Sequence, residues 1–318
     1  MVENYKKYIV DKSIETGFIT STFEKVDRLL NILEWINENI ELKDLLVLKG
    51  GTAINTVVFN FPRLSVDLDF DININLSKEE MLEKRKYIEE TLYRYLESQG
   101  YKINAEKSKN VYALASFVIE YTDVKGNPDN IKVEINYTLR EHILEGKPLE
   151  LSTEIFKNEN FKINCVHPIE IYGAKITALL NRTTARDLFD VYTLAKYDLF
   201  DEEEKEMLKK CFIFYYIAIA GYSLQDMKIE KIEEIQKQDV KNKLIPTLKN
   251  RNPKASDVED MKEMVREYLK DILDLDNNQR LFCEKFKDKI YEPELLFDDE
   301  KILKRVEKHP MVMWKLSQ

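Results

Sequence analysis

Cysteine, histidine and long apolar runs are scarce in this sequence, and each absence excludes a class of protein. The three cysteines, Cys165, Cys211 and Cys283, lie far apart without Cys-x-x-Cys spacing, which excludes a recognisable zinc ribbon or disulfide framework. The presence of only 3 histidines argues against a multi-histidine metal site. The longest apolar stretch, residues 212–221, is shorter than the roughly 18 residues of a membrane span. Because the N-terminus is also too polar for a signal peptide, we expect a cytoplasmic protein with no membrane partner.

The composition indicates a folded chain with an above-average share of charge. Of the 318 residues, 44% are hydrophobic and 34% are charged, and the 17 Tyr and 15 Phe are unusual for a disordered chain. The net charge of -9 argues against a protein that coats nucleic acid non-specifically, although it is compatible with a local basic groove. At about 150 residues per domain, the length predicts two domains.

The chain changes character near residue 200. Before this point strands and helices are mixed, whereas the rest has helical spacing, capping signals and few β-branched runs. Capping boxes that begin at Ser21 and Ser77 predict two helix starts. We therefore expect an α+β fold, with a mixed sheet flanked by helices in residues 1–200 and an α-helical domain in residues 201–318. The predicted strands cover residues 45–48, 66–74, 101–105, 111–121 and 131–137, and the predicted helices cover residues 52–60, 77–100, 168–182 and 186–197.

A pair of glycines, Gly50 and Gly51, separates the first predicted strand from a predicted helix. Without side chains in the way, their backbone N–H groups can approach a phosphate, and the helix N-terminus adds a favourable dipole. Thr52 can cap this helix or form a hydrogen bond with a phosphate oxygen. Taken alone, the pair is better explained by a tight turn, which also requires glycine.

Two aspartates, Asp67 and Asp69, alternate with apolar residues on the next predicted strand, so both carboxylates share one face. Adjacent carboxylates repel each other unless a cation lies between them. Beside a phosphate-binding turn, such a pair is typical of Mg²⁺ sites in phosphoryl transfer. Asp71 continues the same face. The alternative is the solvated face of an edge strand, but the glycines directly upstream favour the metal site.

A third carboxylate, Glu134, lies on the predicted strand 131–137 and shares a face with Lys132 and Asn136. If this strand lies beside the aspartate strand, Glu134 completes a triad that can bind two metals or act as a general base. An exposed glutamate beside a lysine on a half-buried strand is equally ordinary, so the pattern leaves both interpretations open.

The predicted helix 168–182 carries Lys175 and Arg182, which are almost two turns apart and project from one side. Two cations in this arrangement can clamp a triphosphate. A pair of exposed charges on an amphipathic helix is the alternative. Thr184 and Asp187 then have the form of a capping box for the next helix.

Together these segments resemble a known family. The run GGTA…RLSVDLDFDI, followed by K-x-x-A-L-x-x-R and ARDLFDVY, resembles the AbiEii/AbiGii toxin nucleotidyltransferases of type IV toxin–antitoxin systems, within the DNA polymerase β-like superfamily. The resemblance covers residues 45–197 and implies a nucleotidyltransferase-type sheet with a helical C-terminal domain. The superfamily usually has Gly-Ser and a shorter gap than residues 53–66 before its aspartates, but AbiEii-like members share the Gly-Gly-Thr form.

The resemblance implies roles for these residues and adds Ser65 from the RLSVDLDFDI segment. It implies that Asp67, Asp69 and Glu134 bind metal, and that these three residues and Lys175 are catalytic. The nucleotide-binding residues that it implies are Gly50, Gly51, Thr52, Ser65, Lys175, Arg182, Asp187 and Asp190.

The implied activity is the Mg²⁺-dependent transfer of a nucleoside monophosphate from an NTP to an acceptor, with Mn²⁺ as a possible substitute. The resemblance indicates an RNA acceptor, the tRNA 3′ end above all, together with growth arrest, phage defence and a cognate antitoxin. Two alternatives stay open: a nucleotidyltransferase for small molecules or proteins, and a catalytically idle protein that binds a nucleotide or a partner. Clustered carboxylates count against the idle protein.

The helical C-terminal region is expected to bind the acceptor and to supply no chemistry. Its basic residues cluster around one predicted loop, where they can contact an RNA backbone. A solvated loop explains the cluster at least as well. The residues concerned are Lys241, Lys243, Lys249, Arg251 and Lys254.

Overall fold

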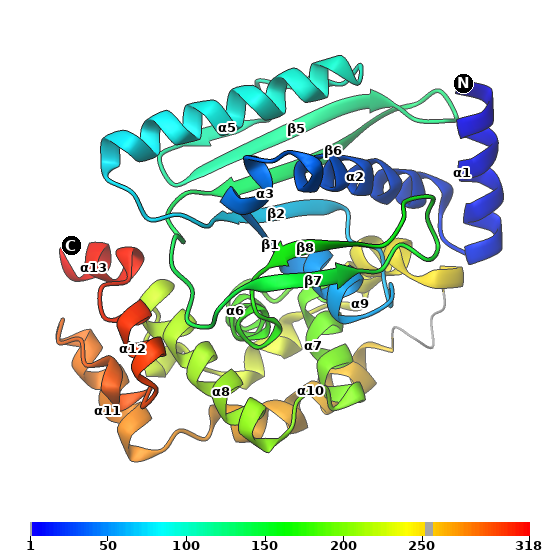
Figure 1. Ribbon diagram of the computed structural model, residues 1–318. Coiled ribbons are helices and arrows are strands. Elements are labelled where there is room, and N and C mark those ends of the chain that lie inside the picture. Colours follow the sequence, from blue (N-terminus) through cyan, green and yellow to red (C-terminus); the bar gives the residue numbers. More distant parts are fainter. Residues whose placement is uncertain (1, 252–256) are drawn as a thin grey trace. The chain divides into compact units, whose positions relative to one another are not determined.

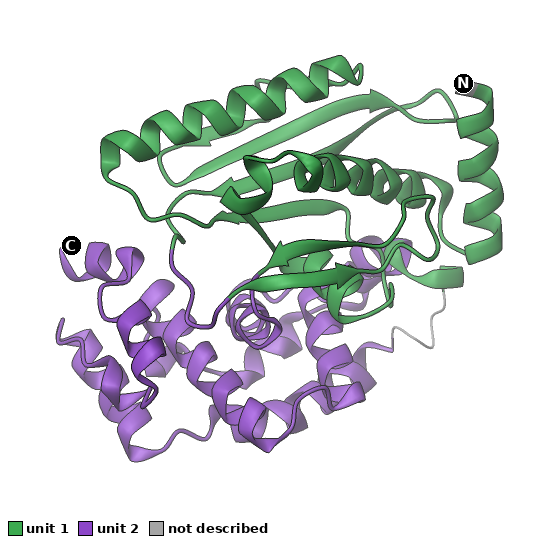
Figure 2. Ribbon diagram, viewed as in Figure 1, with its two compact units in different colours: residues 1–140, 146–165, 247–251 green, residues 141–145, 166–246, 252–318 purple. Residues whose placement is uncertain are grey.

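The computed structural model describes residues 2–251 and 257–318, and the chain forms two compact units (Figure 2). Unit 1 comprises residues 1–140, 146–165 and 247–251, and unit 2 comprises residues 141–145, 166–246 and 252–318. The main change from unit 1 to unit 2 along the sequence falls after residue 165, whereas the predicted catalytic domain extends to residue 200. The predicted boundary separates a catalytic domain from an acceptor-binding domain by their expected functions, and it stays a prediction.

Unit 1 is built on a mixed sheet of eight strands, which confirms the predicted fold class (Figure 1). The strand order is β3-β5-β6-β2-β1-β8-β7, and β4 pairs with β5 outside this path. The pairs β2–β6 and β1–β8 are parallel, and the others are antiparallel. The strands are β1 Leu46–Lys49, β2 Asp67–Ile72, β3 Lys102–Ile103, β4 Lys109–Val111, β5 Leu114–Thr122, β6 Pro128–Asn136, β7 Lys147–Leu151 and β8 Phe161–Cys165.

Helices cover the sheet of unit 1. The longest are α2 (Thr20–Glu38), which contacts β6 and β8, and α5 (Lys78–Ser98), which contacts β3 (Figure 1). The capping box at Ser77 is confirmed, since its hydroxyl accepts a hydrogen bond from the Glu80 amide. The one at Ser21 is wrong, because α2 begins a residue earlier and its N-cap has no side-chain hydrogen bond. The other helices are α1 Val2–Thr16, α3 Leu42–Leu45 and α4 Gly50–Ala53, which continues into a π-helical turn at Ile54–Val58.

Unit 2 is helical throughout the part that the structure describes, as the sequence predicts beyond residue 200. Its central helix α6 (Pro168–Arg182) has the predicted bounds, begins at a proline, and packs against α7 (Ala185–Tyr197) and α8 (Glu202–Ile213). A π-helical turn, Phe214–Ile219, continues α8. The remaining α-helices described are α9 Lys237–Asp239, α10 Val258–Leu273, α11 Asn277–Lys287, α12 Glu300–Val306 and α13 Pro310–Leu316.

None of the helices within residues 2–251 and 257–318 combines the length and the hydropathy that crossing a membrane requires.

Candidate active site

The turn between β1 and α4 requires glycine at Gly50 for two independent reasons. Its φ of +70° lies in the left-handed region that residues with a Cβ rarely adopt. A Cβ on Gly50 would also lie 2.6 Å from Oδ2 of Asp69. The predicted strand-to-helix turn is therefore present, and it brings the backbone directly against a predicted metal ligand.

The rest of the turn packs against residues that precede β2 and forms a hydrogen bond with the first residue of β2. A Cβ on Gly51 would lie 2.9 Å from Oγ of Ser65 and 2.8 Å from Nη2 of Arg63, so both side chains lie against the glycine. The hydroxyl of Thr52 donates a hydrogen bond to the backbone carbonyl of Asp67. The expectation that Thr52 caps the helix is wrong, because α4 has no side-chain cap and this hydroxyl instead ties the turn to β2.

Strand register places the third predicted carboxylate beside the second. Strand β6 runs parallel to β2, with Glu134 paired to Asp69 and Lys132 paired to Asp67. Residues paired on neighbouring strands point to the same side of a sheet. The strand of Glu134 therefore lies beside the aspartate strand, with Glu134 on the same face as Asp69. Glu134 also forms an ion pair with Lys132, with 3.2 Å between the carboxylate oxygen and Nζ.

Carboxylate crowding alters the acidity of Asp69. Burial raises its pKa to about 6, aided by the negative charges of Asp67 and Glu134 and opposed by the positive charge of Lys49. The side chains of Asp67 and Asp69 are only half-buried, so they remain accessible from solvent. A cation bound here would relieve the carboxylate repulsion that adds to the effect of burial on this pKa.

Lys49 is a residue of this site that the sequence reasoning missed. It ends β1, pairs with Asp69 in the antiparallel register, and donates a hydrogen bond to the carboxylate of Asp71. Asp71, which the sequence places on the same face as Asp67 and Asp69, is buried, and its carboxylate forms an ion pair with Lys49. The available signal was the position of Lys49, directly before Gly50 on a short apolar strand.

The oxygen donors of Asp67, Asp69 and Glu134 fit a divalent cation such as Mg²⁺, which prefers oxygen ligands. Across residues 2–251 and 257–318, no three histidine, cysteine or acidic side chains converge closely enough to hold a metal by themselves. Mg²⁺ is commonly held by one or two carboxylates together with substrate phosphates and water. The donor set is therefore suited to a metal that arrives with a phosphorylated substrate.

In unit 2, Lys175 is an interior residue held between two aspartates. Its Nζ lies 2.9 Å from Oδ1 of Asp187 and 3.1 Å from Oδ2 of Asp190, and all three side chains are buried. Arg182 reaches the same Asp187 carboxylate at 3.1 Å, which confirms that the two cations project from one side of α6. The alternative of two exposed charges is wrong for Lys175, which is buried between the aspartates of α7, whereas Arg182 is 58% exposed. The triphosphate clamp stays a prediction.

Asp187 is the centre of this cluster. Burial alone would raise its pKa, but the charges of Lys175 and Arg182 and the hydrogen bond from the Thr184 hydroxyl hold the pKa well below the ordinary value. Thr184 also accepts a hydrogen bond from the Asp187 amide, so the predicted N-cap of α7 is present. The carboxylate is therefore ionised at neutral pH and fixes the start of α7.

A glycine turn beside clustered carboxylates on a mixed sheet is typical of proteins that bind nucleotides and metal ions. Residues 32–289 match the family model described as nucleotidyl transferase AbiEii toxin, type IV toxin–antitoxin system. The match covers most of the chain, so the chain belongs to this family and is a nucleotidyltransferase toxin.

Among solved structures, the fold is similar to that of MenT4, a nucleotidyltransferase toxin from Mycobacterium tuberculosis H37Rv. The TM-score is 0.62 at 14% sequence identity, and the similarity covers 97% of this chain and 98% of that one. At this identity the comparison shows a shared fold. No curated protein matches the sequence.

Proposed function

We propose that this toxin transfers a nucleoside monophosphate from an NTP to the 3′ end of tRNA in a Mg²⁺-dependent reaction. The observation that carries the proposal is the parallel register of β2 and β6, which sets Glu134 beside Asp69, next to the Gly50 turn. An oxygen-rich site with a raised carboxyl pKa beside a bare backbone turn suits a metal-bound triphosphate.

In the proposed site of unit 1, each residue has a role that follows from its position. Asp67 and Asp69 hold the metal, and Glu134 either completes its coordination or accepts the proton of the attacking hydroxyl. When bound, Mg²⁺ neutralises charge on the phosphates as the pyrophosphate leaves. The backbone N–H groups at Gly50 and Gly51, with the neighbouring Ser65, bind the phosphate oxygens.

The cluster in unit 2 contributes to nucleotide binding in this proposal. Lys175 already has two carboxylate partners, so its first task is to hold Asp187 and Asp190 in place. Arg182 is 58% exposed and has guanidinium donors beyond those that contact Asp187, so it is better placed than Lys175 to contact a phosphate.

The decisive experiment is a transfer assay with total tRNA. The wild-type protein is incubated with each labelled NTP in turn and Mg²⁺, with Asp69→Asn as the inactive control. We expect label on tRNA from the wild type alone, and no label on tRNA whose 3′ hydroxyls have been oxidised. Label on a protein or a small molecule, with none on tRNA, would overturn the acceptor and support the alternative enzyme. Omission of divalent metal, followed by addition of Mg²⁺ or Mn²⁺, tests the cofactor.

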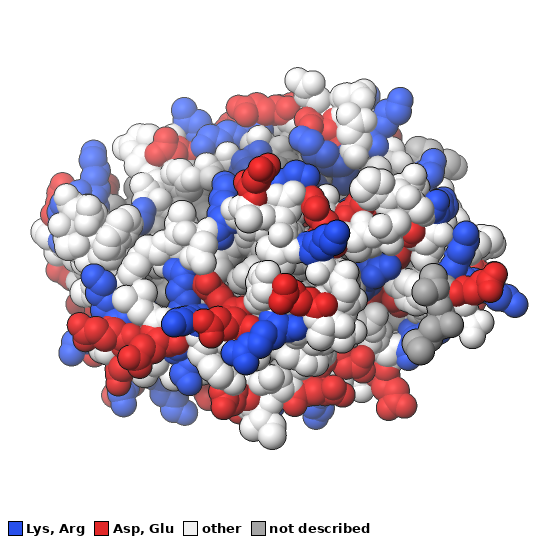
Figure 3. Space-filling view, turned by 90° about the horizontal axis from the view of Figure 1, so that it is seen from above, with Lys and Arg blue, Asp and Glu red and all other residues white. Residues whose placement is uncertain are grey.

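The biological setting follows from the family. A type IV toxin acts with a cognate antitoxin, and modification of tRNA in the cytoplasm would arrest growth and serve phage defence. We propose that the helical region beyond residue 200 binds the acceptor. On the face drawn in Figure 3, basic and acidic side chains are interspersed, so we expect recognition through a local group of cations.

The predicted basic loop does not form one cluster within one unit. Lys243 forms an ion pair with Asp239 at 2.7 Å, which uses part of the positive charge that the sequence attributes to this loop. Its role in RNA binding stays a prediction. Lys241 and Lys243 belong to unit 2, Lys249 and Arg251 belong to unit 1, and Lys254 lies outside the described residues.

A further inference from the structure

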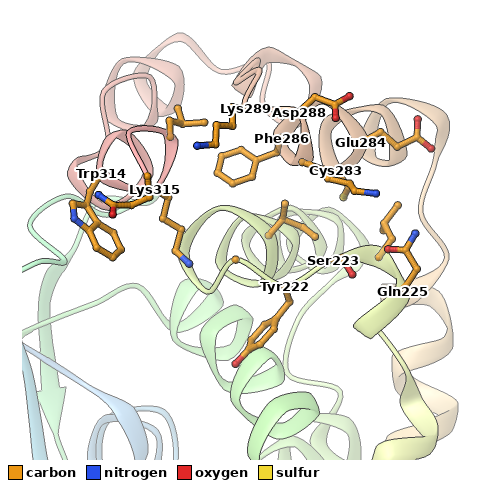
Figure 4. A pocket seen from close by; sticks show the side chains of 16 residues that line it. Tyr222, Ser223, Gln225, Cys283, Glu284, Phe286, Asp288, Lys289, Trp314 and Lys315 are labelled. Atoms are coloured by element: carbon orange, nitrogen blue, oxygen red, sulfur yellow. The ribbon is translucent and has the colours of Figure 1, made fainter.

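A cavity of about 820 Å³ lies within unit 2, far along the sequence from the carboxylates of the proposed active site. Its walls come from the end of α11, from α13, and from the segment after the π-helical turn Phe214–Ile219 (Figure 4). The volume is in the range of small-ligand sites, so it can hold a nucleotide. The family assignment gives this cavity no role.

The lysines of the cavity carry charge that the protein does not compensate. Lys287, Lys289 and Lys315 all line it, and none of the three forms an ion pair within the part of the chain that the structure describes. Two acidic residues, Glu284 and Asp288, also line it, but their carboxylates point outward in Figure 4. The interior is therefore suited to an anion.

Lys315 is held in place by the backbone. Its Nζ donates a hydrogen bond of 2.7 Å to the carbonyl of Ala220, and it lies so close to Gly221 that a Cβ there would collide with it. Gly221 has a φ of +80°, so glycine is required on conformational grounds as well. An ammonium group has three donors, and this contact leaves two of them for a ligand.

One aromatic ring of the cavity has its face available. Phe286 contacts the rings of Phe282 and Tyr291, and Tyr222 packs at 5.0 Å from Tyr216. Trp314 makes no ring contact with another aromatic residue among those described, and it is 56% exposed. An exposed tryptophan beside uncompensated lysines is the combination by which proteins bind single-stranded nucleic acid, through base stacking and phosphate contacts.

We propose that this cavity binds a nucleotide within single-stranded RNA, with Trp314 stacking on the base and Lys289 and Lys315 contacting the phosphates. Proteins normally recognise phosphopeptides through clusters of arginine side chains, and no arginine is among the described residues that line this cavity. This inference rests on the proposed RNA acceptor and assigns the place where the strand is held. The site acts in binding, and the transfer chemistry belongs to the carboxylates of unit 1.

The test uses the scarcity of tryptophan in the chain, which has only Trp35 and Trp314. Trp35 stacks on Tyr95, so Trp35→Phe keeps an aromatic ring there and leaves Trp314 as the single reporter. A single-stranded oligoadenylate hexamer is titrated into this variant of the full chain without NTP. We expect the hexamer to quench Trp314 fluorescence, while the same strand in a duplex and free AMP quench it much less.

Binding variants assign the contacts, with the affinity of a fluorescein-labelled hexamer as the readout. Trp314→Leu should raise Kd about fivefold or more, the lower end of what removing one base–aromatic stack costs. Lys289→Gln should reduce the slope of log affinity against log salt by about 0.7. The matched controls are Tyr112→Leu, an aromatic residue of similar exposure in unit 1, and Lys301→Gln, an exposed lysine outside the cavity; neither should change binding.

The outcomes separate this inference from the proposed function. Suppose that tRNA is labelled in the transfer assay, but the hexamer does not quench Trp314 fluorescence and its affinity is unchanged by Trp314→Leu. The cavity assignment is then wrong and the proposed function stands. If the hexamer binds as expected but label never reaches tRNA, the acceptor is wrong and the RNA site stands. Equal binding of free AMP, or quenching by a polyglutamate peptide in place of RNA, would overturn the inference.

Discussion

Glu134 lies beside Asp69 because β6 runs parallel to β2 in the register that pairs these two residues. The two positions are 65 residues apart in sequence, yet the negative charge of Glu134 helps to raise the pKa of Asp69. Lys49, paired with Asp69 from the other side, moderates the repulsion without removing it. Three neighbouring strands thus concentrate negative charge next to a glycine turn, and we propose that this arrangement attracts a cation.

The first prediction concerns Asp69→Asn. Transfer should be abolished, since the variant lacks one of the carboxylates that we propose to hold the metal. In metal-free buffer at pH 7.5 the variant should be more stable than the wild type by about 1 kcal/mol, because a folded pKa of about 6 makes the ionised form costly. Thermal denaturation measures this difference. Added Mg²⁺ should raise the Tm of the wild type but not of the variant. Asp67→Asn should likewise abolish transfer, and near-normal turnover of either variant at saturating Mg²⁺ would refute the metal site.

The second prediction compares two glycines with positive φ. Gly50→Ala should abolish transfer, because a Cβ would collide with the Asp69 carboxylate, and the strained φ should cost roughly 1–2 kcal/mol of stability. Gly126→Ala is the control, because its φ is +90° but nothing lies within 4 Å of the added Cβ. It should lose similar stability and keep its transfer activity. Equal activity of the two variants would show that the turn does not constrain Asp69.

The third prediction concerns Lys175. Lys175→Ala leaves Asp187 and Asp190 buried without their ammonium partner, so it should lower the free energy of unfolding by about 3–5 kcal/mol. The double variant Lys175→Met with Asp190→Asn removes one charge of each sign and should recover most of the stability. If the folded double variant also regains transfer, Lys175 is not a nucleotide-binding residue.

The fourth prediction is a pH dependence set by Asp187. Its pKa is lowered in the folded protein, so the folded state binds fewer protons there than the unfolded state. The resulting stabilisation is fully present above the unfolded pKa of roughly 4 and is lost as the pH falls toward the folded value. Asp187→Asn should therefore be less stable than the wild type at pH 7 by about 2 kcal/mol, and the gap should narrow below pH 4. Urea unfolding of both proteins from pH 7 to pH 3 measures it; a constant gap would contradict the pairing.

A fifth prediction tests the basic loop against the cavity as the place where RNA binds. If Lys249 and Arg251 neutralise RNA phosphates, replacing both with glutamine should flatten the salt dependence of tRNA binding by about one unit for each phosphate that is no longer neutralised. Affinity measured at two salt concentrations gives the slope. A slope identical to that of the wild type would leave the loop as a solvated segment.

Much of the fold and part of the site are determined by local sequence. The alternation around Asp67 and Asp69 predicts a strand with both carboxylates on one face, and β2 has that form. The capping box at Ser77 and the proline at Pro168 define where α5 and α6 begin. These features can be read from the sequence because each depends on backbone periodicity or on hydrogen bonds between residues a few positions apart.

Only the tertiary structure decided which of these residues act together. The sequence left the role of Glu134 open, because its neighbour on the sheet depends on which distant strand pairs with β6 and in which register. It also gave no sign that Lys175 is buried between Asp187 and Asp190, and it did not show that Lys49 pairs with Asp69. Strand register and the burial of ion pairs are set by packing among distant segments, because a charge that local sequence places on a helix or strand face finds its partner only when another element packs against it.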